Sequence, residues 1–448
     1  MVKALLLTLF VLVFGAGLTI AADLTTQPAV GQWLELPNTK IRTVLPVPTP
    51  GGNSGPTSIT VAWNGAALDS KRSRLIIWGG GHGDYFGNEI YALDLHSQAM
   101  VRLTDPSPYC NQAVCTEFLQ DGQPTARHTY DGLTYVPETD QFMSMGGALS
   151  PCGNGATRMW LYSFGTSKWL EKNTLGQNPD WDGNGQLCVY DPVTKNVYFD
   201  DEVTLSRYTV STNTWAIIGT HAYIDYHLTA AIDTKRRKMV TLGDGVRTID
   251  LTTGAMTTLA TTNAPALASN GQSPGIAYDP VADRIVAWHG GNTVYVLNLD
   301  TKQWTSVNPS SGPGQAAPSQ GTWGRWAYVP EYGVFAMVNS IDMNGWVFRL
   351  EAGTSVEKKS TLSANSAAQA ITLSPNPFKT STAIGLPAGS AFSVKVFDLS
   401  GKEVADLSAS TRISGMVNWR PEGLSGGVYI LKVRVDGQVF SKTLLYQK

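Results

Sequence analysis

Histidine, arginine and tyrosine side chains recur at two positions of a strand pattern that repeats along this chain. One position is the start of an apolar strand, and the other is the loop that follows the next strand. The candidates for catalysis there are His82, Arg127, His128, Tyr226 and His227. Histidine and tyrosine transfer protons, and arginine pairs with carboxylates. This set could carry acid–base catalysis on an anionic substrate.

Other residues at the same two positions have side chains suited to holding a ligand. Aromatic rings offer flat apolar faces, and polar groups supply the hydrogen bonds that fix orientation. Each residue alone also has a structural interpretation; either arginine, for example, could tie neighbouring repeats together. The prediction of a site therefore depends on convergence at one face. The candidates for substrate binding are Tyr85, Asn88, Asp244, His289, Trp323 and Arg325.

The repeat that must position these residues is clearest between residues 274 and 307. Two apolar strands flank the turn at 279–283, a third strand spans 293–300, and a fourth contains Trp304. Short antiparallel strands in units of roughly 40–50 residues predict an all-β fold, a β-propeller built of blades. Similar units begin near Ser58, Arg127, Gly185, His227 and Thr322.

The sixth unit lacks a fourth strand, and Gln32-Trp33-Leu34-Glu35-Leu36 resembles the fourth strand of the fifth unit. We predict that this N-terminal segment closes the ring and removes its open edge. The pattern favours six blades, and a seventh within Asp105–Gly122 or Ala216–Tyr226 is the alternative.

In a propeller, the starts of the innermost strands and the loops after the second strands share one face. The candidate residues should therefore meet at one mouth. The first turns of the units lie on the opposite face, where we expect ordinary solvated residues. These are Lys71, Arg72, Arg74, Glu138, Lys195, Lys235, Arg236, Arg237, Lys238 and Asp283.

Two segments carry a family pattern. Ile77-Trp78-Gly79-Gly80-Gly81 followed by the strand at 90–95 resembles the kelch double-glycine motif, as does Met145-Gly146-Gly147 followed by Trp160 and Trp169. The resemblance covers residues 30–352 and implies a kelch-like β-propeller. It says little about function, because such propellers include both enzymes and binding modules.

Three functions compete for the mouth. A polysaccharide lyase that acts by β-elimination needs a cation for the uronate, which either arginine would supply, and a base, which a histidine or Tyr226 would supply. The set is similar in kind to that of propeller-fold ulvan lyases. The alternative is a non-catalytic module that binds a glycan or a protein. We favour cleavage of an acidic extracellular polysaccharide slightly over binding.

The third function is a copper radical oxidase, because Tyr226-His227 resembles the Tyr-His pair of galactose oxidase-like propellers. That chemistry also needs a thiol that crosslinks to a tyrosine, and we expect the cysteines to be held in disulfides. No cofactor is therefore predicted. A glycosidase is a weaker alternative, because nothing in the sequence fixes the separation of its carboxylates. These would be Asp200, Asp201, Glu202 and Asp244.

Residues 371–448 form a second β pattern beyond a Ser- and Ala-rich linker at 353–370. Its segments Leu373–Phe378, Val396–Lys402 and Gly427–Val433 closely resemble the C-terminal sorting domain of type IX secretion substrates. The resemblance implies recognition by the type IX secretion machinery and transport across an outer membrane. We expect this domain to be a small Ig-like β-sandwich.

Residues 1–22 have the pattern of a signal peptide, with Lys3 before an apolar run and small residues at Ala21 and Ala22. The mature protein is therefore expected outside the cytoplasm, where cysteines form disulfides. Four cysteines allow three disulfide pairings. A Cys110–Cys115 disulfide would close a short loop and leave Cys152 to pair with Cys188. With a net charge of −2 and no basic stripe, the chain is not expected to bind nucleic acid. We expect the protein to be a monomer.

Overall fold

The computed structural model describes residues 27–448 except 112–114, 178, 180–185, 270, 272, 351–370, 387–391, 399–401, 409–415 and 436–437. The predicted signal peptide and linker lie outside the described residues. The chain divides into two compact units, residues 1–353 and 354–448. Within the described part of the chain, no helix combines the length and apolar character that crossing a bilayer requires. Its helical turns are α1 (Ser58–Val61), η1 (Ile41–Val44), η2 (Gly55–Thr57), η3 (Val210–Thr212), η4 (Ala266–Ala268) and η5 (Trp323–Arg325).

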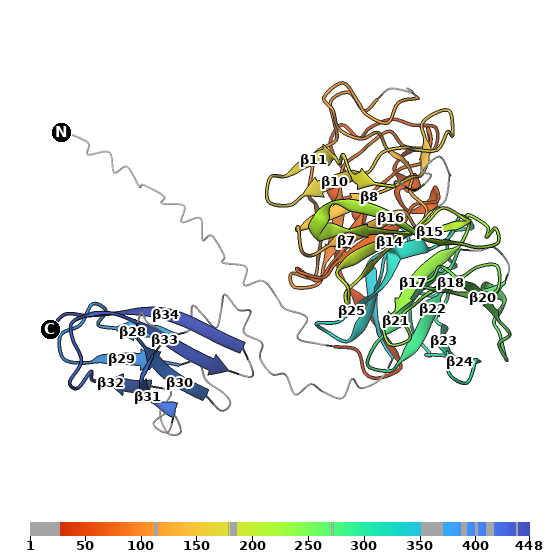
Figure 1. Ribbon diagram of the computed structural model, residues 1–448. Helices are drawn as coiled ribbons and strands as arrows, with labels where there is room; N and C mark the ends of the chain where they lie inside the picture. The colour runs from red at the N-terminus through yellow and green to blue at the C-terminus, as the bar shows by residue number, and fades with distance from the viewer. Residues whose placement is uncertain are drawn as a thin grey trace, which may run out of the picture. The chain divides into compact units, whose positions relative to one another are not determined.

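Each of the six sequence repeats forms one sheet of the first unit (Figure 1), antiparallel except that β12 (Leu175–Gly176) joins β16 (Thr214–Thr220) of the third sheet in parallel. Sheet 1 contains β2 (Ala66–Asp69), β3 (Arg74–Ile77), β4 (Tyr91–Asp94) and β5 (Ala99–Arg102). Sheet 2 contains β7 (Leu133–Val136), β8 (Gln141–Ser144), β10 (Trp160–Ser163) and β11 (Lys168–Glu171). Sheet 3 contains β13 (Leu187–Asp191), β14 (Asn196–Asp200), β15 (Thr204–Thr209), β16 (Thr214–Thr220) and the added β12 (Leu175–Gly176).

The remaining sheets repeat the same order of strands. Sheet 4 contains β17 (Thr229–Asp233), β18 (Lys238–Leu242), β19 (Val246–Asp250) and β20 (Met256–Leu259). Sheet 5 contains β21 (Gly275–Asp279), β22 (Arg284–Trp288), β23 (Val294–Asn298) and β24 (Gln303–Val307). Sheet 6 contains β25 (Trp326–Val329), β26 (Val334–Met337), β27 (Gly345–Arg349) and β1 (Gln32–Leu36).

The N-terminal strand completes sheet 6, as the sequence predicts. β1 runs antiparallel to β27, with Trp33 opposite Phe348. The two segments in which a seventh unit was the alternative form no further sheet. Residues 216–220 belong to β16, and the described part of 105–122 contains no strand.

The first strands of the sheets pack on one another in cyclic order: β2 on β7, β7 on β13, β13 on β17, β17 on β21, β21 on β25, and β25 on β2. Apolar side chains on both faces of each sheet make this packing favourable. Six hydrophobic clusters fill the spaces between successive sheets, and one of them, with Leu93 and Val347, joins sheet 6 to sheet 1. The core is thus divided among the sheet–sheet contacts.

The first turns of the sheets are not merely solvated, contrary to the expectation from the sequence. The Arg236 guanidinium in sheet 4 donates to Asp233 in its own turn and to Asp283 in sheet 5, at 2.7–2.8 Å. Arg72 joins sheet 1 to Asp140 of sheet 2 in the same way. These side chains hold neighbouring sheets together at this end of the unit.

The cysteines form a pairing that the sequence did not favour. Cys115 and Cys152 make a disulfide, with Cα atoms 5.6 Å apart, whereas Cys110 and Cys188 are free and buried. Cys188 packs between sheets 2 and 3, and Cys110 lies near Glu89, whose charge adds to the effect of burial in raising the pKa of the Cys110 thiol to about 11. A disulfide is confirmed, but both Cys110–Cys115 and Cys152–Cys188 are wrong.

The second unit consists of two antiparallel sheets. They share one core, to which Ile384 and Trp419 contribute from the first sheet and Val396 and Leu431 from the second. The first sheet contains β28 (Thr372–Ser374), β29 (Thr382–Gly385) and β32 (Met416–Trp419). The second contains β31 (Glu403–Asp406), β30 (Phe392–Phe397), β33 (Gly427–Val435) and β34 (Gln438–Tyr446).

Candidate functional site

The strand register brings two sets of segments to one end of the first unit. The first residue of each inner strand lies opposite the last residue of the second strand, as with Thr229 and Leu242, or Gly275 and Trp288. The segment before the inner strand and the loop after the second strand therefore lie at the same end. We call this end the opening. It is where the repeat pattern places the candidate residues.

Aromatic rings from four sheets form a contiguous cluster at the opening. His128 lies 4.2 Å from His82, 4.8 Å from Trp63 and 5.8 Å from Tyr130, between ring centroids. Tyr130 in turn lies 5.9 Å from Tyr226 and 5.5 Å from Trp323. The Tyr226 ring lies 3.9 Å from His227. We call these seven residues the aromatic cluster: Trp63, His82, His128, Tyr130, Tyr226, His227 and Trp323.

Four members of the aromatic cluster occupy equivalent places in the fold, three positions before an inner strand: Trp63 before β2, Tyr130 before β7, Tyr226 before β17 and Trp323 before β25. Three of them have left-handed backbones, with φ of 47° at Trp63, 46° at Tyr130 and 53° at Trp323. This conformation is uncommon for bulky side chains, so the surrounding structure must impose it. Packing of the inner strands therefore holds these rings in place.

His128 is buried, and its Nε2 lies 3.2 Å from a carboxylate oxygen of Asp84. Burial and, to a smaller extent, the charge of nearby His82 lower the pKa of His128 to about 4, against the opposing effect of Asp84. The imidazole is therefore neutral at pH 7. Its Nδ1 has no hydrogen-bond partner among the described residues. His82, in contrast, is exposed to solvent beside it.

A second histidine–aspartate pair lies at the opening on sheet 4. The Nδ1 of His227 is 2.8 Å from Asp225, which also accepts the backbone N–H of His227 at 2.6 Å. Half-buried Glu202 lies nearby on the loop after β14. Burial, followed by the charges of Asp225 and other carboxylates, raises the pKa of Glu202 to about 7. His221, next to this loop, forms a 2.7 Å pair with buried Asp200.

The two arginines of the prediction are held by backbone carbonyls. Arg325 is fully buried and donates to Asn64 at 2.9 Å, to Gly321 at 2.6 Å and to the carbonyls of 338 and 339. Arg127, also fully buried, donates to the carbonyls of Thr125 and Glu117. Burial lowers the pKa of Arg127 to about 10 and that of Arg325 to about 9. Both side chains stabilise loops, and the Nη1 of Arg127 has no hydrogen-bond partner among the described residues. A contact of either arginine with a substrate carboxylate stays a prediction.

Several predicted binding residues also have structural contacts. Tyr85 is buried and donates to Glu89 at 2.5 Å, and Asn88 bridges the carbonyl of Pro124 and the N–H of Ser107. Buried Trp323 donates to the carbonyl of Gln320 but keeps its ring in the aromatic cluster. Asn88 therefore positions the 105–124 segment, and Tyr85 is bonded to Glu89 of its own loop.

The last two residues predicted to bind substrate, Asp244 and His289, are not members of the aromatic cluster. Asp244 is exposed and pairs with Arg247 at 2.8 Å. His289 is half-buried, with its Nδ1 3.4 Å from the Thr322 hydroxyl. Burial lowers the pKa of His289 to about 4, with a contribution from the charge of Arg325.

The sequence reasoning missed Trp63, Tyr130 and Asp225. The signal that could have found the two aromatic residues is their spacing, because each stands three positions before an inner strand, as Tyr226 and Trp323 do. Asp225 stands two residues before His227, at the spacing from which a carboxylate can cap both the backbone and the ring.

Metal and thiol chemistry have no assembled site in the structure as far as it is described. Among the described residues, no three or more His, Cys, Asp or Glu side chains are grouped to hold a metal ion. The Cys188 side chain faces sheet 2, whereas Tyr226 belongs to sheet 4. The contact between Tyr226 and His227 is present, but Cys188 is not placed to crosslink to this tyrosine.

Comparisons with known proteins identify the second unit. No curated protein matches the chain. A solved structure of PorZ, described as an essential bacterial surface component of the type IX secretion system of Porphyromonas gingivalis, aligns at 12% identity with a TM-score of 0.37. That alignment covers 86% of this chain and 51% of the PorZ chain, so this chain spans about half the length of its match. Residues 372–447 match the family described as the secretion system C-terminal sorting domain. The C-terminal unit is therefore a type IX secretion sorting domain, and the protein is exported across the outer membrane to the cell surface or the medium.

Proposed function

We propose that the first unit is a six-bladed, kelch-like β-propeller whose aromatic cluster binds a saccharide chain outside the cell. The cyclic packing of the inner strands supports the propeller, and the two-sheet core of the second unit supports an Ig-like sandwich. The observation that carries the function is the aromatic cluster at one opening, in which buried Tyr130 and Trp323 support the partly exposed rings of Trp63 and Tyr226.

The charges at the opening favour a neutral saccharide. Asp84, Asp225 and Glu202 border the aromatic cluster, whereas Arg127 and Arg325 are buried and bonded to carbonyls. The expectation of an acidic polysaccharide rested on these two arginines as ligands. Because carboxylates repel an anionic chain, we propose a neutral polysaccharide in its place.

Binding is tested by isothermal titration calorimetry of the mature protein against neutral polysaccharides (xylan, mannan, soluble β-glucan) and acidic ones (alginate, pectate). We expect neutral chains to bind and Tyr226→Ala to weaken them about tenfold, because one stacked ring contributes on the order of 1 kcal/mol. The matched control is Tyr190→Ala, a half-buried tyrosine that bonds to Glu138 at the opposite end. Equal loss in both variants, or binding of acidic chains alone, would contradict the proposal.

Cleavage of the bound chain is the second candidate function. It is favoured by one observation: exposed His82 contacts His128, whose other side is held by Asp84. Such a pair could accept a proton from the attacking water, and Glu202, with a pKa of about 7, could donate one to the leaving glycosidic oxygen. A neutral chain has no uronate from which a proton could be eliminated, so its cleavage would be hydrolysis, which releases reducing ends. We expect His82→Asn to abolish this release and to weaken binding less than Tyr226→Ala does; no release from any polysaccharide removes this candidate.

A further inference from the structure

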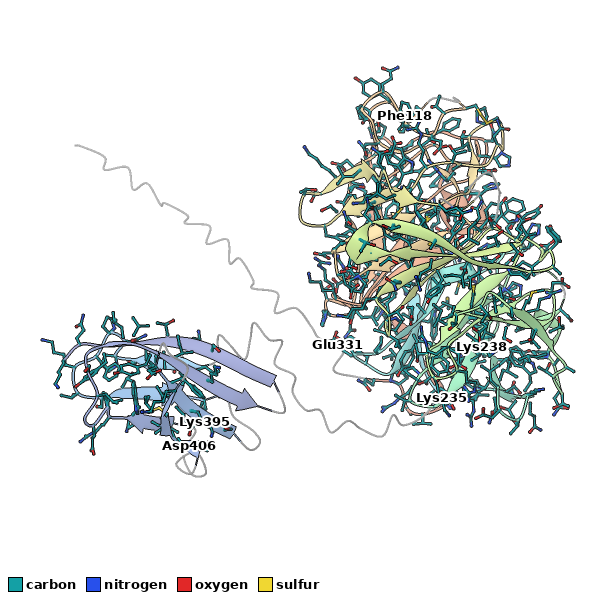
Figure 2. All side chains as sticks on the ribbon, in the orientation of Figure 1. Phe118, Lys235, Lys238, Glu331, Lys395 and Asp406 are labelled. Carbon is teal, nitrogen blue, oxygen red and sulfur yellow. A yellow bond between two sulfur atoms is a disulfide. The ribbon has the colours of Figure 1, made fainter. Side chains whose placement is uncertain are left out.

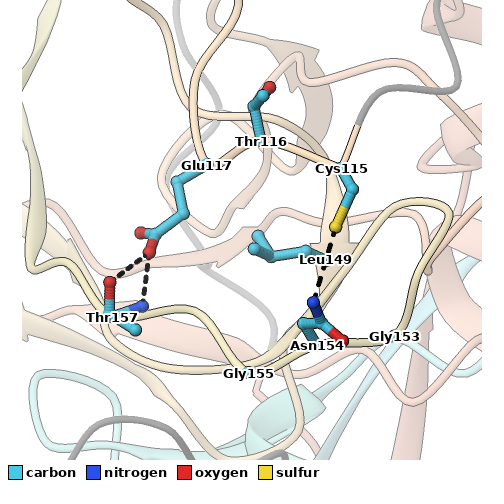
Figure 3. A pocket seen from close by; sticks show the side chains of 8 residues that line it. All are labelled: Cys115, Thr116, Glu117, Leu149, Gly153, Asn154, Gly155 and Thr157. Atoms are coloured by element: carbon cyan, nitrogen blue, oxygen red, sulfur yellow. Dashed lines mark hydrogen bonds between the residues drawn. The ribbon is translucent and has the colours of Figure 1, made fainter.

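A pocket of about 690 Å³ lies between the segment that begins at Cys115 and the loop that begins at Leu149. One wall is the 115–117 segment and the other is the loop 149–157 (Figure 3). The disulfide between Cys115 and Cys152 joins the two walls. The volume is that of an ordinary ligand pocket. The pocket is lined by Cys115, Thr116, Glu117, Leu149, Gly153, Asn154, Gly155 and Thr157.

The groups that line this pocket suit a polyhydroxylated ligand. Thr116 and Asn154 are exposed. The Thr116 hydroxyl donates to the carbonyl of Phe118 at 2.8 Å and the Asn154 amide to the Cys115 sulfur at 3.8 Å (Figure 3), so their side-chain oxygens remain to accept hydrogen bonds from a ligand. One oxygen of buried Glu117 accepts from the N–H and hydroxyl of Thr157 at 2.5 and 2.6 Å (Figure 3). The other oxygen has no donor among the described residues, and a buried acceptor in this state is costly. A ligand hydroxyl would be a suitable donor.

An aromatic ring stands beside the pocket. Phe118 is 45% exposed at the outer margin of the first unit (Figure 2), and the Arg158 guanidinium lies 5.2 Å from its ring centroid. Phe118 and Arg158 directly follow Glu117 and Thr157 in the chain. An exposed ring next to convergent polar groups is a surface on which a sugar can stack.

The pocket and the aromatic cluster share one two-stranded ribbon. In it, β6 (Arg127–His128) pairs with β9 (Ala148–Leu149), with His128 opposite Ala148 and Arg127 opposite Leu149. His128 belongs to the aromatic cluster and Leu149 lines the pocket. Beyond β9, Pro151 and Ser150 approach Gly83, the neighbour of His82. Only the loop that begins at Leu149 separates the two regions.

We propose that this pocket is a second saccharide subsite, so that the ligand is a chain of several sugar units that extends from the aromatic cluster over the loop at 149–155. This inference rests on the proposed function, because it assigns a saccharide to both regions. The disulfide keeps the pocket walls at a fixed separation, and Asn154 and Thr116 bind the distal sugars. The preferred ligand is therefore a neutral oligosaccharide, and single sugars bind weakly.

The test is calorimetry on the mature protein with disaccharides, tetrasaccharides and hexasaccharides from xylan, mannan and β-glucan. We expect affinity to rise about tenfold with length in one series. The double variant Thr116→Ala/Asn154→Ala should lose this increase and keep the affinity for the disaccharide. The double variant Cys115→Ser/Cys152→Ser should behave in the same way, because it releases the pocket walls. Thr257→Ala, an exposed threonine on β20, is the control.

The outcomes separate this inference from the proposed function. Affinity that is independent of length, or an increase that survives in the Thr116→Ala/Asn154→Ala variant, overturns the subsite but leaves saccharide binding at the aromatic cluster. Absence of binding at every length overturns both. Should the cysteine variant fail to fold, the Thr116→Ala/Asn154→Ala variant decides, because both of its side chains are exposed.

Discussion

At the residue scale, the opening combines rings with histidines that are held by aspartates. His128 is bonded to Asp84 and His227 to Asp225, while His82 stays exposed. An aspartate fixes the orientation of an imidazole and the nitrogen that carries the proton. The same arrangement serves to orient a ligand hydroxyl or to transfer its proton. The residues of the opening are therefore compatible with both binding and cleavage.

The pH response of His128 follows from its burial. Its pKa of about 4 in the folded protein lies below the ordinary value of 6.5, so the unfolded chain binds more protons between these values. The stability that neutral His128 contributes is complete above pH 6.5 and is lost as pH falls toward 4. We expect the ring protons of His128 to titrate near pH 4 by NMR. His128→Asn should remove that resonance, and a midpoint at or above 6.5 would contradict the burial of this ring.

The arginines show what residue-level reasoning from sequence leaves open. Arg127 and Arg325 stand at positions from which a side chain could face a ligand, yet both guanidinium groups turn inward. Backbone carbonyls left by irregular loops need donors, and a buried arginine supplies several at once. Sequence spacing places a side chain at one end of the unit but does not decide between facing the opening and satisfying a loop.

At the element scale, the double-glycine motif Gly146-Gly147 positions β6, the strand that contains His128. A side chain on Gly147 would collide with the carbonyl of His128, and one on Gly146 with the amide of Gln186. Both glycines have positive φ, 63° at Gly146 and 93° at Gly147. The motif thus lets β9 and β6 approach closely and brings His128 to the aromatic cluster. The close approach of β6 and β9 is the physical reason for the two glycines, which the sequence shows only as a resemblance to the kelch motif.

The arginines of the first turns should contribute measurable stability. Arg236 bonds to Asp233, which is fully buried, and to Asp283 of the next sheet. Arg236→Met leaves the buried carboxylate without this donor and should lower the free energy of unfolding by about 1–3 kcal/mol. Lys238→Met, which removes only a 3.9 Å pair with Asp250, should change it by less than about 0.5 kcal/mol. Chemical denaturation distinguishes them, and equal effects would argue against a link between sheets.

At the scale of the whole molecule, the N-terminal strand joins the two ends of the first unit. Trp33 on β1 packs against Trp288 and Trp326 at 6.2 and 5.7 Å and donates to the carbonyl of Asn292 at 2.8 Å. It therefore links sheet 6 to sheet 5. Trp33→Ala should lower the free energy of unfolding by about 3–5 kcal/mol. Exposed Gln32→Ala on the same strand should have little effect, and an equally small effect at Trp33 would contradict closure by this strand.

Export depends on the second unit, and activity is expected to depend on the first. A chain that ends at residue 353 lacks the sorting domain at 372–447 but keeps the first compact unit. We expect it to accumulate in the periplasm of a host with type IX secretion and to retain saccharide binding. Cell fractionation with immunoblotting checks the location, and calorimetry checks the binding. Release of the truncated chain into the medium would show a second export signal.

The sequence by itself determined the features that depend on local pattern. The strand repeats, the use of residues 32–36 to complete the sixth sheet and the sorting domain are all read from periodicity and motifs. The tertiary structure decided what depends on distant contacts: the Cys115–Cys152 bond, the inward arginines, the ion pairs between first turns, and the neighbours of Tyr130. The physical reason is that alternation of apolar residues fixes a strand and its buried face. Which polar side chains meet across sheets depends on loop geometry and on the buried groups that each loop leaves unpaired.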